Sequence, residues 1–224
     1  MKKSHYIIIL SFIAVAFSFA QHKKTDTMML RQGNLLFGKP QSYLVKNSWG
    51  MDLIISTNGF GLGNFYGYNF SDEFTGKVNL SIAESKDERE MEVYNPYTGA
   101  LFTPNKVNRF IVFPLLFGAE YRLFKDEIVD NFRPYVSAMA GPTLIFSTPY
   151  EIEFFESLKY GRSHYTVGGY VGFGAFFGSE QKNILGVNIR YYFIPYKSGI
   201  ESLQFVKKKD FGGFSISLSF GTGW

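Results

Sequence analysis

The sequence predicts an all-β protein, an eight-stranded antiparallel up-and-down transmembrane β-barrel. Residues 211–224 alternate apolar and small polar side chains and finish on Trp224. Aromatic residues make up 19% of the chain and there are 23 glycines, which favours one-sided strands over a helical bundle. Long and short connections also alternate between the strand-like segments. After residue 20 no segment has 18 consecutive apolar residues, so a membrane-spanning helix is not expected.

Residues 1–20 have the pattern of a cleaved signal peptide. Lys2 and Lys3 supply positive charge, residues 6–17 form an apolar run, and the sequence around Ala20 suits cleavage. The alternative is an uncleaved anchor, but the run is shorter than the roughly 20 residues of a spanning helix. The sequence contains no cysteine, which excludes a lipoprotein anchor and disulfide bonds.

The remaining chain is expected to hold one domain behind a short extension. Residues 21–48 lack periodicity and are expected to form a periplasmic extension, whereas residues 49–224 form the barrel. Removing Lys2 and Lys3 from the 23 basic residues leaves 21, against 19 acidic residues. This balance gives no reason to expect a nucleic-acid partner.

The first three strands are expected at 49–57, 60–70 and 77–85. Asn58-Gly59 is a two-residue hairpin signal between the first two strands. The second strand places aromatic side chains and Leu62 on one face and glycines on the other. A polar turn at 71–76 leads into the third strand.

The next four strands are expected at 109–124, 132–147, 163–178 and 183–195, each apolar on its outward face. The eighth strand begins near residue 214, and its serines are expected to face a filled interior. Its expected lipid-facing residues are Phe214, Ile216, Leu218, Phe220 and Trp224.

The connections predict how the barrel is oriented. Transmembrane barrels have short periplasmic turns and longer outer loops. The long connections 86–108, 148–162 and 196–210 are therefore expected outside, and both termini in the periplasm. The tight turn at Asn58-Gly59 is an exception, because it should then also be extracellular.

A soluble barrel or sandwich, such as a lipocalin, is the alternative fold. Its apolar face would point inward and its polar face toward water. Three observations argue against it: the glycine-rich face is too small and featureless for a solvated surface, several strands exceed the usual five or six residues, and Tyr and Phe recur near strand ends.

The stretch Arg133-Pro134-Tyr135-Val136-Ser137-Ala138-Met139-Ala140-Gly141 resembles the R-P-Y-x-x-A-x-A-G strand of the outer-membrane protein A-like β-barrel family. Residues 186–195 followed by 211–224 are similar to the last hairpin of that family. The resemblance covers about 49–224 and extends to small Bacteroidota-type outer-membrane barrels, many without an assigned function. It implies outer-membrane localisation and recognition of the C-terminal strand, ending in Trp224, by the barrel insertion machinery.

Strand parity predicts charged side chains inside the barrel. An eight-stranded barrel is just wide enough to be filled by side chains, so buried charges there must be paired. A polar plug is the favoured interpretation, and a narrow gated pore for small solutes is the alternative. The expected interior network is Asp52, Glu120, Arg122 and Arg190, accompanied by Asn79, Asn188, Tyr170 and Tyr192.

His164 is the candidate for catalysis. It is expected at the outer rim of the barrel, facing inward beside Ser163 and near Glu151, Glu153 and Glu156. Lipid A deacylases that are barrels place a Ser-His-acid triad near the outer leaflet, so a lipid-modifying enzyme is an alternative function. Adjacent strand residues point to opposite faces, however, which argues against a Ser163–His164 pair.

Two outer-loop segments are candidates for binding. Lys207-Lys208-Lys209 could bind lipopolysaccharide phosphates or could be a solvated cluster. Tyr94-Asn95-Pro96-Tyr97-Thr98-Gly99 reads as a turn whose tyrosines could anchor a partner or lie at the lipid interface.

The sequence therefore predicts a monomeric outer-membrane barrel with a packed polar interior and a structural or partner-binding role. No catalytic activity, cofactor or metal is expected, because no phosphate-binding loop and no metal-ligand spacing occurs. Expected contacts are outer-membrane lipid and lipopolysaccharide, the insertion machinery and a possible protein partner at the outer loops. The alternative functions are the lipid-modifying enzyme using His164 and a narrow pore or transporter.

Overall fold

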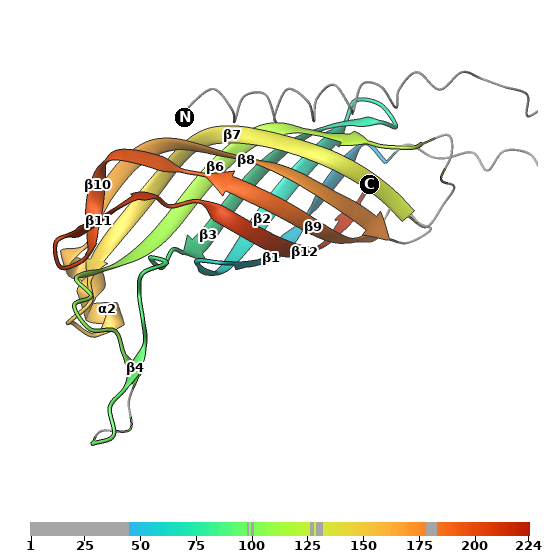
Figure 1. Cartoon of the computed structure of the whole chain (residues 1–224). Coiled ribbons are helices and arrows are strands. Elements are labelled where there is room, and N and C mark those ends of the chain that lie inside the picture. Colours follow the sequence, from blue (N-terminus) through green and yellow to red (C-terminus); the bar gives the residue numbers. More distant parts are fainter. Residues whose placement is uncertain (1–44, 98, 100, 126–127, 129–131, 178–182) are drawn as a thin grey trace, which may run out of the picture. The chain divides into compact units, whose positions relative to one another are not determined.

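The computed structural model describes residues 45–224 apart from 98, 100, 126–127, 129–131 and 178–182. Eight long antiparallel strands close into a barrel (Figure 1), which confirms the predicted fold class. The strands are β1 (Asn47–Ser56), β2 (Gly59–Asn69), β3 (Phe74–Glu84), β6 (Asn108–Arg122), β7 (Phe132–Pro149), β8 (Arg162–Phe177), β9 (Asn183–Phe193) and β12 (Gly213–Gly223).

The barrel closes where the first strand pairs with the last. Leu53 lies opposite Leu218, and Ser56 lies opposite Ser215, across β1 and β12. The other neighbours are consecutive long strands, so the barrel has the up-and-down order β1-β12-β9-β8-β7-β6-β3-β2. The expected bounds differ most at the start of β3, which begins at residue 74 rather than 77. The predicted signal peptide and most of the predicted extension lie outside the described residues.

The first hairpin turn differs by one residue from the prediction. Ser56 pairs with Gly59, so the two turn residues are Thr57 and Asn58 rather than Asn58 and Gly59. Gly59 has a φ of +142°. Glycine adopts this backbone conformation readily, so it stands at the first residue of β2 instead of inside the turn.

We name the two ends of the barrel by their connections. The loop end carries the Thr57-Asn58 turn and the three long connections; the turn end carries the other turns and Trp224. The long connections contain structure of their own, at the left of Figure 1. They hold the hairpins β4 (Val93–Tyr94) with β5 (Leu101–Phe102) and β10 (Pro195–Leu203) with β11 (Val206–Asp210), and the short helices α2 (Phe154–Ser157) and η2 (Leu158–Tyr160).

The outer wall of the barrel is apolar. On β12, Ile216 exposes 44% of its surface, whereas Ser217 exposes none. The middle of the wall carries aliphatic side chains such as Leu53, Leu80 and Val187. Exposed aromatic residues lie toward both ends of the wall. Those toward the loop end include Phe60, Tyr165, Phe193 and Phe214, and those toward the turn end are Trp49, Tyr66, Tyr68, Phe70, Phe74, Tyr121, Phe132, Phe177 and Trp224. Among the described residues, no helix is both long enough and apolar enough to cross a membrane.

The interior is only partly polar, which corrects the predicted polar interior. Its loop-end half is filled by an apolar cluster: Phe110, Val112, Leu116, Met139, Ile145, Tyr170, Tyr192, Ile194, Ile200 and Phe211. The reason is that β6 and β7 carry large apolar side chains on their inward faces as well, a pattern that one-sided strands would not have. Ile200 of β10 and Phe211, which follows β11, belong to this cluster, and Tyr196 of β10 packs against it.

Inward-facing glycines make room for large interior side chains. A Cβ on Gly174 would lie 2.7 Å from the Tyr135 hydroxyl, and one on Gly50 would lie 2.6 Å from the Phe65 ring. Real Cβ atoms do not approach other atoms this closely. The small face of one strand is therefore matched by bulky residues directly opposite on the neighbouring strand, Tyr135 beside Gly174 and Phe65 beside Gly50, and the barrel is filled.

Candidate functional site

The middle of the barrel is crossed by an ion pair between Asp52 and Arg190. The Arg190 guanidinium donates to Asp52 Oδ2 at 2.8 Å, and both residues are at most 1% exposed. Ser219 Oγ donates to Oδ1 at 2.5 Å and Asn79 Nδ2 donates to Oδ2 at 3.2 Å. The carboxylate therefore receives bonds from three strands besides its own.

The same network continues to neighbouring polar side chains. Arg190 lies 5.0 Å from the Tyr170 ring centroid and donates to the Tyr192 hydroxyl at 3.4 Å. Asn188 donates to Ser219 Oγ at 2.8 Å, which links it to Asp52.

Glu120 pairs with Lys77, a residue that the predicted network did not include. Lys77 Nζ donates to Glu120 Oε1 at 2.7 Å, and both side chains are buried. The ammonium also lies 4.1 Å from the centroid of the Phe65 ring. The inward position of Lys77 follows from the alternation that places Val78 outward, so strand parity alone would have found it.

Arg122, the fourth predicted member, is separate from both ion pairs. It is half-buried at the turn end and lines a cavity of about 110 Å³ together with Arg133. Among the described residues it has no carboxylate within ion-pair distance.

The described interior side chains block the barrel rather than line an open channel. A smaller cavity of about 40 Å³ lies near the loop end, lined by Ile54, Val112 and Phe211. Val112 and Phe211 belong to the apolar cluster, and between this cavity and the turn-end cavity lie the ion pair of Asp52 with Arg190 and the fully buried Leu116. An eight-stranded barrel leaves room for little else.

His164 contacts a different serine from the one considered in the sequence. Ser147 Oγ lies 3.1 Å from His164 Nε2, and the Tyr196 hydroxyl lies 3.4 Å from Nδ1. Ser163 is exposed on the opposite face of β8. Within the described part of the chain, no carboxylate hydrogen bonds to His164, and Glu151, Glu153 and Glu156 are exposed. The imidazole thus joins β7 to β10 and lacks the acid that would orient a catalytic base.

The long connections are fastened to one another around Asp87. Its carboxylate accepts from Arg89 Nε and Nη2, each at 2.8 Å, and from Ser202 Oγ at 2.5 Å. Burial acts to raise the pKa of Asp87, but these hydrogen bonds from Arg89 and Ser202 hold it well below its ordinary value. Asp87 thereby joins the first long connection to β10.

Further contacts make the loop end one packed layer. Glu90 and Lys106 form a buried ion pair at 2.5 Å. The Val107 amide donates to the Ser202 carbonyl at 2.8 Å, and the Tyr150 amide donates to the Val107 carbonyl at 2.9 Å. All three long connections therefore share main-chain hydrogen bonds.

The lysine run at 207–209 is divided by strand alternation. Lys208 is buried and donates to the Lys86 carbonyl, and burial lowers the pKa of its ammonium. Lys207 and Lys209 are exposed. Only two of the three charges are therefore free to meet an external phosphate.

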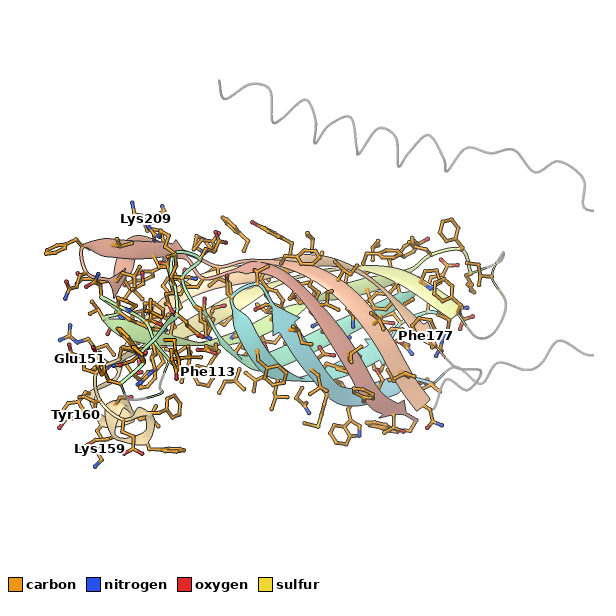
Figure 2. All side chains as sticks on the ribbon, turned by 60° about the horizontal axis from the view of Figure 1, so that its bottom comes forward. Phe113, Glu151, Lys159, Tyr160, Phe177 and Lys209 are labelled. Carbon is orange, nitrogen blue, oxygen red and sulfur yellow. The ribbon has the colours of Figure 1, made fainter. Side chains whose placement is uncertain are left out.

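The most exposed aromatic side chains project from the tips of the two loop-end hairpins. Tyr97, between β4 and β5, and Phe205, between β10 and β11, are each 97% exposed. Phe155 and Tyr160 add exposed rings from the helical connection. Figure 2 shows Tyr160, Lys159 and Lys209 at this end and Phe177 at the other.

The predicted lipid-facing residues of the last strand are all on the outer wall. Phe214, Ile216, Leu218, Phe220 and Trp224 are between 38% and 57% exposed, whereas Ser215, Ser217 and Ser219 are buried.

Comparison with known proteins gives similarity in structure only. No family model matches the chain, and no curated protein matches it. The N-terminal β-barrel domain of Pseudomonas aeruginosa OprF is 14% identical, with 80% of this chain and 98% of that chain covered and a TM-score of 0.46. Neisserial surface protein A is 12% identical, with 79% and 91% covered and a TM-score of 0.43. Ail of Yersinia pestis, its attachment invasion locus protein, is 12% identical, with 79% and 94% covered and a TM-score of 0.39.

Proposed function

We propose that this protein is an outer-membrane β-barrel that holds a folded partner-binding surface outside the cell. The barrel is its anchor, and its filled interior makes it a scaffold rather than a passage for solutes. The single observation that carries the proposal is the pair of hairpin tips, Tyr97 and Phe205, that present exposed rings from a tightly connected loop end.

The outer wall supports a membrane location. Large apolar side chains are exposed on the long strands from β1 to β12, while polar groups are turned inward. An apolar surface of this extent would be costly in water, but in a bilayer it contacts lipid chains. The closed barrel also leaves no unpaired strand edge. The aromatic residues near the turn end match an interfacial girdle. The loop end then faces outward and the turn end faces the periplasm.

The ring of Phe205 suits binding because the β10–β11 hairpin that carries it is bonded to the first long connection. An aromatic side chain with few rotatable bonds loses little entropy when it is buried by a partner. The loop end below it is held by the Asp87 contacts and the Glu90–Lys106 ion pair. The partner therefore meets a preformed surface, which lowers the cost of association.

Crosslinking in intact cells tests this proposal. A photoreactive amino acid at position 97 or 205 should give a defined crosslinked product. The same group at Phe124, an exposed aromatic at the turn end, is the matched control and should not give that product. Products from positions 97 and 205 that contain only lipopolysaccharide would show that the loop end meets its own membrane, and an absence of any product would contradict partner binding.

A further inference from the structure

The cavity at the turn end is lined by two arginines. It has a volume of about 110 Å³ and is lined by residues of several strands, among them Thr75, Arg122, Arg133 and Tyr135. Arg122 lies opposite Tyr135 in the pairing of β6 with β7, so Arg133 is its diagonal neighbour on the same face. Diagonal positions are roughly 7–8 Å apart, within reach of two long side chains directed at one ligand.

Neither arginine has a counterion in the described part of the chain. The acidic residues that line the cavity are Glu120, Asp72 and Glu73. Lys77 pairs with Glu120 at 2.7 Å, and Lys125 pairs with Asp72 at 3.3 Å and with Glu73 at 3.6 Å. The three carboxylates are thus paired with lysines, and the two guanidiniums have no carboxylate partner among the described residues.

Buried donors around the cavity also lack partners. The Nε atoms of Arg122 and Arg133 are buried without a hydrogen bond to any described residue. The same holds for the hydroxyl of Tyr135, a residue that is only 2% exposed and stacks on Phe176 at 4.5 Å. Buried polar groups are normally hydrogen-bonded, so three unpartnered donors around one cavity need an acceptor.

We propose that this cavity binds the oxyanion of a phosphate group that enters from the turn end. Two guanidiniums offer planar forks of donors that match a tetrahedral oxyanion, and the Tyr135 hydroxyl supplies a neutral donor deeper in the site. The phosphate comes from a small solute or from an anionic lipid headgroup, and the chemistry of recognition is the same for both. The site faces away from the loop end, so it is independent of the proposed partner surface.

The first arm of the test uses inorganic phosphate. The full chain carries isotope-labelled arginine and tyrosine in micelles of a maltoside detergent, which contain no phosphate, and phosphate replaces chloride at constant ionic strength. The Nε–H signals of Arg122 and Arg133 are expected to shift and saturate. Arg122→Gln or Arg133→Gln should weaken the apparent affinity about tenfold, equivalent to about 1.4 kcal/mol. Arg162→Gln, at an exposed arginine of the loop end, is the matched control and should change nothing.

The second arm adds phosphatidylglycerol to the phosphate-free micelles and omits free phosphate. Shifts of the same two signals in this arm would assign the ligand to the lipid headgroup, and shifts only in the first arm would assign it to a solute. If the shifts of the Arg122 and Arg133 signals saturate in neither arm, the proposal is overturned. Shifts of the Tyr135 ring signals that saturate equally in the double variant Arg122→Gln/Arg133→Gln would also overturn it.

Thermal unfolding separates binding from a structural role. The double variant removes two like charges that have no described counterion, so its unfolding temperature without phosphate should equal or exceed that of the wild type. Added phosphate should raise the unfolding temperature of the wild type only. A marked drop in the double variant would show that the guanidiniums stabilise the fold, which would also overturn the proposal.

Discussion

Arg190 on β9 donates to Asp52 on β1 at 2.8 Å, and the bond crosses β12, the strand that lies between them. Taking two charges out of water costs several kcal/mol per ion, in order-of-magnitude terms, and their attraction offsets this only when other hydrogen bonds complete the site. Ser219 and Asn79 complete the shell of Asp52. The pair therefore fixes the relative positions of strands that meet at the closure of the barrel.

Breaking this pair on one side should destabilise the protein strongly. Asp52→Asn leaves a buried guanidinium without a counterion, and we expect a loss of about 3–5 kcal/mol in the free energy of unfolding. The double variant Asp52→Asn/Arg190→Met should lose less, because no buried charge remains. Urea unfolding of the barrel in vesicles measures both, with Arg162→Gln as an exposed control. A loss below about 1 kcal/mol in the single variant would contradict a desolvated pair.

The filled interior should not conduct ions. The ion pair of Asp52 with Arg190 and the inner part of the apolar cluster occupy the space between the two cavities, so we expect planar bilayers with the wild type to show no stepwise currents. Leu116→Gly and Ile145→Gly, which empty part of the cluster, should not open a path past Arg190. Regular single-channel steps from the wild type would favour the narrow pore instead.

A charge on the outer wall should oppose insertion. Leu218→Arg places a guanidinium on the lipid-facing side of β12, where the expected cost is about 2–4 kcal/mol near the bilayer midplane. Phe205→Arg places the same group on an exposed residue of the loop end and should cost close to nothing. Folding yields into vesicles compare the two. Equal yields would argue that the outer wall does not face lipid.

The strands and their faces were predictable because successive side chains of a strand point to opposite faces of the sheet. That rule placed Ile216 outside and Ser217 inside with no knowledge of partners. The placement of Asp52 and Arg190 in the interior followed from the same rule. The predicted position of the first turn was wrong by one residue. The glycine that signals a hairpin can be the first residue of the next strand as well as part of the turn.

The contacts inside the barrel were not predictable, because they depend on register and tilt between strands far apart in sequence. Glu120 pairs with Lys77, which the predicted network did not include, and His164 meets Ser147, which the sequence did not single out. The loop-end hairpins were also missed, since β10 and β11 are mostly polar, pair irregularly and depend on the layer they cover. Tertiary context decides such segments more than local pattern does.

The Asp87 contacts should make the loop end sensitive to acid. The pKa of this carboxyl is lowered in the folded protein, so the stability it contributes is fully present above its ordinary pKa of about 4. That contribution is lost as the pH falls below this value toward the lowered folded pKa. Hydrogen exchange of the Arg89 amide, which donates to Asp87 at 3.1 Å, should therefore stay slow relative to intrinsic rates at pH 5 and accelerate at lower pH. Asp87→Asn should remove the pH dependence.

Phe205 holds a backbone conformation that a phenylalanine rarely adopts. Its φ is +65°, in the left-handed region, and its side chain is 97% exposed at the tip of the hairpin. A non-glycine residue there costs about 1–2 kcal/mol. Phe205→Gly should stabilise the hairpin, seen as slower hydrogen exchange of β10 and β11, while weakening the partner contact. Tyr97→Ser, at a tip without this strain, should weaken contact with no gain in stability. Faster exchange in Phe205→Gly would show that the ring supports the loop end itself.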